Sequence, residues 1–198
     1  MGKYSELFDN LIVVRGAGDL ATATIIRLHN SGFKVIALEV EKPTVIRRTV
    51  SFAQAMFDSD ATVEGVTARR TELESALDVI RQKMIPIVAD PDGKAIRLYK
   101  PEVVVDAIIA KRNHGTSMDM APLTIALGPG FEAGKEVTRV IETARGHNLA
   151  HLIYKGCASP STGIPGNIAG FTTERVIHSP CCGIFRATKK IGDIVKKG

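Results

Sequence analysis

The chain has 198 residues, 44% of them hydrophobic, and a formal net charge of +5, which is typical of one globular core with room for a small second domain. Membrane spans and signal peptides are excluded, because no apolar run is long enough and the first residues lack the required pattern, so we expect a cytoplasmic protein that does not enter membranes. With three Tyr, seven Phe and no Trp, an aromatic platform for nucleic acid is not expected, whereas a small anionic ligand suits the modest positive charge.

The first forty residues predict a β-α-β unit. Residues 11–14 form a short apolar run that ends before Gly16 and Gly18, as in a strand that is buried on both faces. Apolar positions then recur at helical spacing over residues 21–30, and residues 34–40 form a second, mostly apolar run. Two strands joined by one helix predict parallel pairing with a right-handed crossover.

The middle of the chain predicts further helices and strands of the same sheet. A loop leads into a helix around residues 50–57. Residues 71–74 have the pattern of a capping box, which predicts a helix that ends near Lys83. Short β-branched runs at residues 85–89 and 103–109 predict two more strands.

The second half of the chain has a different pattern, because glycines become frequent and helical periodicity is rare after about residue 115. Short apolar runs predict strands at residues 124–127, 149–154, 174–177 and 183–187. The predicted fold class is therefore α/β: a Rossmann-like parallel sheet with helices over residues 1–115, followed by a smaller, β-rich and glycine-rich domain over residues 116–198. Residues 191–198 are typical of a strand and turn that enter a lipoyl-like sandwich, so we expect either a terminal hairpin or a natural chain that extends further.

Residues 16–21 match the phosphate-binding pattern G-x-G-x-x-A. In this pattern Gly16 permits a tight turn, Gly18 lets the backbone approach a pyrophosphate, and Ala21 lets the helix close onto the sheet. The helix N-terminus then offers N–H groups and a positive dipole end to the phosphates. Glu39, at the end of the second strand, is placed to accept hydrogen bonds from ribose hydroxyls. The alternative is a Rossmann-like unit that has the turn but binds no nucleotide.

Charged residues near this turn favour or oppose an anionic ligand. Asp19 lies inside the turn and would repel a phosphate unless its carboxylate points away or binds a metal. Arg47 and Arg48, and further along the chain Lys111 and Arg112, form two basic pairs after predicted strands, where ligands of open sheets bind. Each pair would either hold an anionic ligand or lie on the solvated surface.

Histidines and cysteines are the remaining candidates for chemistry. His147 and His151 have the spacing H-x-x-x-H, but the glutamate of a zinc peptidase is missing, so no metal site is predicted. Cys157, Cys181 and Cys182 are odd in number and two of them are adjacent, which favours a reducing compartment over a disulfide framework. Two interpretations of these thiols stay open: exposed groups that handle sulfur or selenium, or small semi-buried residues.

Six segments spread along the chain resemble the sequences of a known protein family. They are VVRGAGDLATATIIRLHNSGFKVIALE, PTVIRRTVSFAQAMFD, VEGV, EVVVDAIIAKRNHGT, IALGPGFEAGKEVTRVIETARGH and GIPGNIAGFTTERVIHSP. Together they resemble the YqeB family, accessory proteins of selenium-dependent molybdenum hydroxylases. The first unit is also similar to the Rossmann domain of XdhC-type maturation factors, with Gly16, Gly18 and Glu39 at matching positions, although residues 19–21 replace the His-Val-Gly of that group.

The resemblance implies an accessory or maturation factor for a molybdenum hydroxylase, which would be its client and partner. It implies an NAD-like dinucleotide or a molybdopterin dinucleotide as the ligand of residues 16–21, and it leaves self-association open. Two other functions remain. One is an NAD-dependent oxidoreductase, for which no Tyr-x-x-x-Lys pair or comparable proton-transfer group is visible. The other is a non-catalytic chaperone or scaffold for the hydroxylase.

Overall fold

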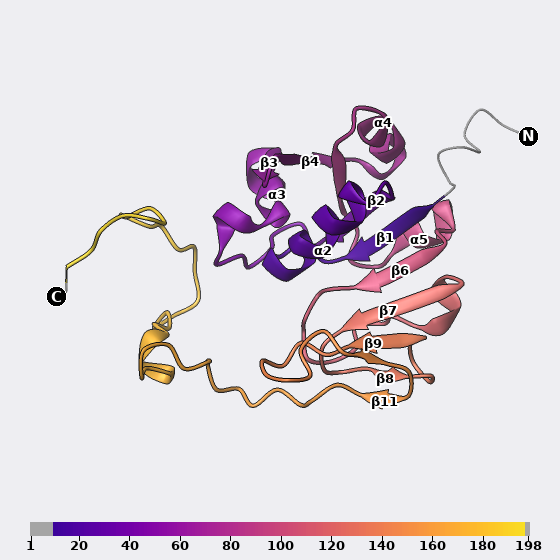
Figure 1. Cartoon of the computed structure of the whole chain (residues 1–198). Coiled ribbons are helices and arrows are strands. Elements are labelled where there is room, and N and C mark those ends of the chain that lie inside the picture. Colours follow the sequence, from indigo (N-terminus) through magenta and orange to yellow (C-terminus); the bar gives the residue numbers. More distant parts are fainter. Residues whose placement is uncertain (1–9, 197–198) are drawn as a thin grey trace, which may run out of the picture. The chain divides into compact units, whose positions relative to one another are not determined.

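The computed structural model describes residues 10–196 of the chain. The chain divides into two compact units, Met1–Pro160 and Ser161–Gly198 (Figure 1). The first unit contains every α-helix of the described residues and a nine-stranded sheet. No helix among residues 10–196 is both long enough and apolar enough to cross a lipid bilayer.

The order of the strands identifies the fold of the first unit. The sheet runs β10-β9-β7-β6-β1-β2-β5-β4-β3. The strands are β1 (Leu11–Arg15), β2 (Lys34–Glu39), β3 (Asp60–Val63), β4 (Val66–Thr71), β5 (Ile85–Ala89), β6 (Val103–Asp106), β7 (Leu123–Leu127), β9 (Arg139–Ile141) and β10 (Leu152–Ile153). Six of them, β5-β2-β1-β6-β7-β9, are parallel and lie in the 3-2-1-4-5-6 order of dinucleotide-binding folds. The predicted Rossmann-like α/β class is confirmed.

The two edges of the sheet depart from this simple order. β4 pairs parallel to β5, and β3 returns antiparallel to β4 as a hairpin. At the opposite edge, β10 pairs antiparallel to β9. The parallel core thus has an antiparallel strand at each edge.

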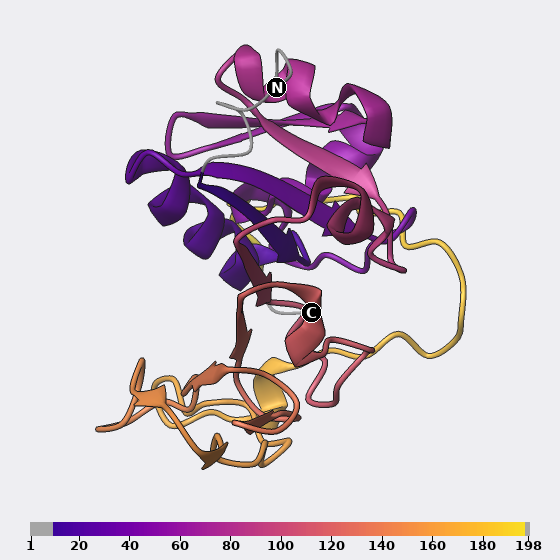
Figure 2. The same cartoon turned by 90° about the vertical axis from the view of Figure 1, so that its right-hand side faces the viewer.

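Helices pack on both faces of the sheet (Figures 1 and 2). Side chains alternate along a strand, so the even-numbered residues of β1 face one layer and the odd-numbered residues face the other. On one face, α2 (Asp19–Asn30) buries Ile25 and Ile26 in the same cluster as Ile12 and Val14. On the other face, α4 (Ala76–Arg81) and α5 (Lys94–Tyr99) pack in a cluster with Leu11 and Val13. The shorter helices are η1 (Arg48–Val50), η2 (Phe52–Gln54), α3 (Ala55–Asp58), η3 (Leu73–Ser75), η4 (Met118–Met120) and η5 (Thr173–Arg175).

A smaller sheet follows β7. It pairs β8 (Glu132–Ala133) with β11 (Gly156–Cys157) in antiparallel fashion. Its core joins Phe131 and Val137 to Val140 of β9. The predicted strands at residues 124–127 and 149–154 are present, the second of them shortened to β10.

A buried carboxylate joins the end of β9 to a later segment of the chain. Glu142 follows β9 and is only 4% exposed. Its two oxygens accept hydrogen bonds from the backbone amides of Thr143 and Ala144, both at 2.8 Å, and of Ser159, at 2.7 Å. Burial by itself raises the pKa of Glu142, but these amide donors outweigh burial and lower the pKa to about 2. Glu142 therefore holds the segment around Ser159 against the end of β9.

The capping box predicted at residues 71–74 is wrong. Thr71 is the last residue of β4, where it pairs with Val88 of β5, so its backbone is in a strand. The helical segment that follows begins with the short helix η3, and neither Glu72 nor Ser75 makes a side-chain capping hydrogen bond. The helix predicted around residues 50–57 is three short pieces, and the β3–β4 hairpin and α5 are additions to the predicted elements.

The β-rich half ends earlier than predicted. The described residues 161–196 contain no strand, and the segments predicted as strands at 174–177 and 183–187 contain only η5 or no regular structure. No residue in this range is buried, so apolar side chains there have no core to pack on. Of the predicted terminal hairpin, residues 191–196 are not extended strand, and residues 197–198 lie outside the described part. The sheet also continues across the domain boundary predicted near residue 115, because β7 pairs with β6. The division into a nucleotide-binding domain and a second, β-rich domain stays a prediction.

Candidate functional site

The predicted phosphate turn lies where the order of the parallel strands reverses. It links the end of β1 to the start of α2, and β1 lies between β2 and β6. Ligands of open α/β sheets bind at this switch point, beyond the carboxyl ends of the strands. The position of the turn in the fold therefore agrees with its sequence pattern.

Gly16 is required by the fold itself. Its φ is +97°, and a Cβ built on it would lie 2.9 Å from the backbone oxygen of Ala107, which follows β6. Its amide donates to the Leu38 carbonyl at 2.7 Å. Only glycine fits a turn that is pressed this closely between the ends of two neighbouring strands.

Gly18 differs, because nothing in the fold requires a glycine there. It is the N-cap of α2 with φ −63° and ψ −178°, and a Cβ on it would meet no atom within 4 Å. No side-chain hydrogen bond caps the 12-residue helix. No side chain among the described residues therefore caps the first N–H groups of α2, which are the groups that bind a phosphate in this fold. Ala21 is 1% exposed and packs against the sheet, as its place in the pattern predicts.

Residues 51–53, in the loop after β2, hold the turn by hydrogen bonds that the sequence pattern does not reveal. The carbonyl of Ala17 accepts hydrogen bonds from the amide of Ala53 at 2.7 Å and the hydroxyl of Ser51 at 2.9 Å. The Thr22 hydroxyl donates to the same carbonyl at 3.2 Å and accepts from the Phe52 amide at 2.8 Å. The loop after β2 thus holds the turn in one conformation before any ligand arrives.

Glu39 touches the turn directly. Its Oε2 accepts a hydrogen bond from the Ala17 amide at 2.9 Å, and its Oε1 accepts one from the Val40 amide at 2.8 Å. Each oxygen of an ionised carboxylate has two lone pairs, so both can accept one further donor. Glu39 therefore supports the turn, and it keeps the capacity to accept ribose hydroxyls.

Asp19 is paired with one of the predicted basic residues. Its carboxylate forms an ion pair with the guanidinium of Arg47, whose side chain is 70% exposed. This pair offsets the negative charge that would repel a phosphate at the helix N-terminus. Arg48, the first residue of η1, is exposed, and among the described residues its guanidinium has no hydrogen-bond or ion-pair partner.

The second basic pair lies on another loop at the same edge of the sheet. Lys111 and Arg112 are exposed on the loop that follows β6. Gly130, in the loop after β7, lies so close that its Cβ would be 2.5 Å from the Arg112 amide nitrogen. The structure thus brings the two basic pairs and the turn to the carboxyl edge of the sheet, although no contact joins the pairs.

A buried ion pair anchors this loop, and sequence reasoning missed it. Arg15 and Asp106 are opposite each other on β1 and β6, are 4% and 1% exposed, and lie 3.8 Å apart. Arg15 also donates to the carbonyls of Pro91 at 3.1 Å and His114 at 3.0 Å, and to the Thr116 hydroxyl. The signal was present: each residue is a lone charge at the end of an apolar strand.

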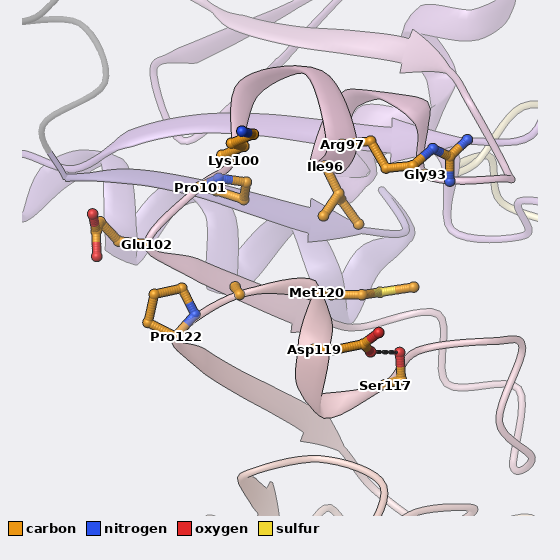
Figure 3. Close-up of a pocket in the computed structure, with 11 residues that line it drawn as sticks. Gly93, Ile96, Arg97, Lys100, Pro101, Glu102, Ser117, Asp119, Met120 and Pro122 are labelled. Carbon is orange, nitrogen blue, oxygen red and sulfur yellow. Dashed lines mark hydrogen bonds between the residues drawn. The ribbon is translucent and has the colours of Figure 1, made fainter.

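The remaining candidates are not gathered into a site. Cys157, Cys181 and Cys182 are free thiols on the surface, and His147 and His151 are exposed. Among the described residues, no group of three or more His, Cys, Asp or Glu side chains is placed to hold a metal ion. A groove of about 810 Å³ lies elsewhere, between α5 and η4, and no residue of the turn lines it (Figure 3).

A curated protein is similar to almost the whole of this chain. The chain is 58% identical over 189 residues to "Uncharacterized protein YqeB" of Escherichia coli strain K12. The match covers 95% of this chain and 35% of that protein, so the chain spans about a third of the length of its curated relative. No family model matches the chain, and no solved structure matches it. The similarity supports the predicted relation of this chain to the YqeB family.

Proposed function

We propose that this protein binds a dinucleotide-like ligand, NAD-like or a molybdopterin dinucleotide, on residues 16–21, and that it acts as an accessory factor of a selenium-dependent molybdenum hydroxylase. Gly18 carries the binding part of the proposal. A side chain at position 18 would fit without strain or collision. We therefore infer that the missing Cβ leaves the backbone accessible to a ligand that approaches it from outside. A pyrophosphate at the N-terminus of α2 is the group that this fold places there.

The neighbouring residues have complementary roles in this proposal. The pyrophosphate would accept hydrogen bonds from the first N–H groups of α2. Arg48, whose side chain has no partner among the described residues, would approach it as a counter-charge. Glu39 would accept hydrogen bonds from a ribose and disfavour a 2′-phosphate. Arg47 would act indirectly, since it neutralises Asp19.

The accessory role rests on the resemblance to the YqeB family and to XdhC-type maturation factors. The proposed partner is the client hydroxylase, and the proposed compartment is the cytoplasm. A Rossmann-like unit is suited to hold a nucleotide cofactor during delivery, because its ligand lies across an open edge of the sheet.

Native mass spectrometry with NAD, FAD and molybdopterin cytosine dinucleotide tests the binding step. Gly18→Ala should abolish the bound mass, because its methyl group fills the phosphate's approach, while the fold stays intact. Gly32→Ala is unsuitable as a control, since Gly32 has φ +90°. Leu149→Ala, at a surface position that is 55% exposed, is the matched control and should bind normally. Full binding by Gly18→Ala would show that the turn does not hold the ligand.

A scaffold for the hydroxylase is the second candidate, and the hydrogen bonds of Glu39 favour it. Both of its carboxylate oxygens already accept amides of the protein, so the turn is stable without a ligand. In that case a Gly18→Ala variant that binds no dinucleotide would still activate the client enzyme. Loss of ligand and activation together would favour the cofactor-handling role.

A further inference from the structure

The loop after β6, residues 107–116, lies directly beside the glycine turn and has no role in the proposed function. A Cβ built on Gly16 would lie 2.9 Å from the Ala107 carbonyl oxygen and 3.1 Å from the Cα of Ile108. β6 also begins the second half of the parallel sheet, β6-β7-β9. In dinucleotide-binding folds each half of the sheet holds one half of the ligand, and the ligand crosses where the strand order reverses. The loop is therefore placed to meet the half of a dinucleotide that lies beyond the pyrophosphate.

The second half of the sheet lacks the helix N-termini that attract anions in such folds. In the first half, α2 follows β1 at the glycine turn. Among the described residues, by contrast, no α-helix follows β6, β7 or β9, and residues 107–122 cross from β6 to β7 with only the three-residue helix η4. No helix dipole thus contributes positive charge at the carboxyl end of β6. Side chains contribute it instead, because Lys111 and Arg112 lie on the loop that follows this strand.

The backbone of this basic pair is fixed in a conformation that residues with a side chain rarely adopt. Ile109 and Lys111 have φ values of +58° and +64°, which are unfavourable for any residue with a Cβ and above all for a β-branched one such as Ile109. Gly130, in the loop after β7, presses on the pair, because its Cβ would lie 2.7 Å from the Lys111 carbonyl carbon. Such conformations persist only where the surrounding structure imposes them, and they cluster at ligand sites.

Polar contacts hold both ends of the loop. The Asp106 carboxylate accepts hydrogen bonds from the Ile108 amide at 3.1 Å and from the Thr116 hydroxyl at 2.6 Å. The Nδ2 of Asn113 donates to the Thr116 carbonyl at 2.9 Å and to the Glu136 carboxylate at 3.1 Å. The loop is thus tied to β6 at one end and to the loop after β8 at the other.

The charged ends of the basic pair take no part in these contacts. Lys111 and Arg112 are both exposed. The Lys111 ammonium has no hydrogen-bond or ion-pair partner in the described part of the chain. The Nε of Arg112 donates to His114 at 3.2 Å, and its two terminal nitrogens have no partner within residues 10–196. A fixed backbone that carries two such cations is pre-organised for an anion, because little conformational freedom is lost on binding.

We propose that Lys111 and Arg112 bind an anionic group at the far end of the dinucleotide, beyond the pyrophosphate. This inference rests on the proposed binding of a dinucleotide to residues 16–21, and it narrows the class of ligand. On the first half of the sheet, Glu39 would accept a ribose without a 2′-phosphate. On the second half, the ligand would carry a negative charge, such as a carboxylate or the enedithiolate of a molybdopterin. A dinucleotide with an uncharged carboxamide at that end, such as NAD, would bind less tightly.

Two closely matched dinucleotides test this inference. Nicotinic acid adenine dinucleotide has a carboxylate where NAD has a carboxamide, and the two are otherwise identical. Isothermal titration calorimetry on the full chain should show that the wild type binds the acid about tenfold or more tightly than NAD, as expected of charge-assisted hydrogen bonds. The double variant Lys111→Gln with Arg112→Gln should bind both with the wild-type affinity for NAD. Its affinity for molybdopterin cytosine dinucleotide should fall by a similar factor.

The matched control is Lys83→Gln with Lys100→Gln, which removes the same charge from the opposite edge of the sheet. Both lysines are exposed and lie just before β5 and β6, at the amino ends of these strands. This control should keep the wild-type preference for the acid, and circular dichroism verifies that both double variants are folded.

The outcomes separate this inference from the proposed function. Equal affinity of the wild type for NAD and the acid would overturn the inference and leave the proposed dinucleotide site in place. So would a double variant at Lys111 and Arg112 that keeps the preference for the acid, or that keeps the wild-type affinity for molybdopterin cytosine dinucleotide. If none of the three dinucleotides binds the wild type, the proposed function fails, and this inference fails with it.

Discussion

Gly16 and Gly18 are two residues apart in one turn, yet the structure predicts opposite consequences when each becomes alanine. For Gly16→Ala, the backbone keeps a φ of +97°, which costs a residue with a side chain about 1 to 3 kcal/mol. Its new methyl group would also lie 2.9 Å from the carbonyl oxygen of Ala107, a backbone atom that cannot move aside cheaply. Overpacking of this kind adds about 1 to 3 kcal/mol. We expect a total loss of about 2 to 6 kcal/mol in the free energy of unfolding.

Gly18→Ala should lose about 0.5 to 1 kcal/mol, since φ is ordinary, no atom lies within 4 Å, and only the preference of helix N-caps for glycine over alanine is lost. Urea unfolding of both variants, followed by circular dichroism, measures the difference directly. Equal stability of the two variants would refute the assignment of Gly16 as the structural glycine and Gly18 as the functional one.

Two further predictions concern buried charges. The pKa of Glu142 is lowered from 4.5 to about 2, so the stability it contributes is complete above pH 4.5 and is lost as pH falls toward 2. Because the Glu142 carboxylate is buried, this contribution is on the order of 3 kcal/mol, and acid unfolding of Glu142→Gln should show a correspondingly flatter pH dependence. Asp106→Asn leaves the guanidinium of Arg15 buried without its counter-charge and should cost about 3 to 5 kcal/mol in urea unfolding. Asp60→Asn breaks an exposed ion pair with Arg69 and should cost far less free energy of unfolding. Equal losses for Asp106→Asn and Asp60→Asn would contradict the claim that burial makes the Arg15–Asp106 pair the more important one.

The β-α-β unit could be predicted because its signals are local. The apolar run of β1, the glycine turn and the periodicity of α2 lie within twenty consecutive residues. The parallel order of β5, β2, β1 and β6 follows from right-handed crossovers once those strands are recognised. Short elements such as α5, with six residues, carry too few periodic positions to be recognised.

Contacts between distant segments could not be predicted in the same way. The pairs Arg15–Asp106 and Arg47–Asp19 join charges that only the folded chain brings together. The capping box failed for a related reason, because the pairing of Thr71 with β5 overrides its local preference for a helix start. Strand predictions at 174–177 and 183–187 failed because β-branched composition forms a strand only where a neighbouring strand or core is present.

The central claim is that a ligand's phosphate lies against residues 16–21. Backbone amide NMR spectra of the isotope-labelled chain, recorded while NAD, FAD or molybdopterin cytosine dinucleotide is added, test it most directly. We predict that at least one of these ligands shifts the amide resonances of Gly18, Asp19 and Leu20 more than those of the rest of the chain. If a ligand binds and its largest shifts lie elsewhere, or if none of the three shifts these amides, the proposed phosphate site is contradicted.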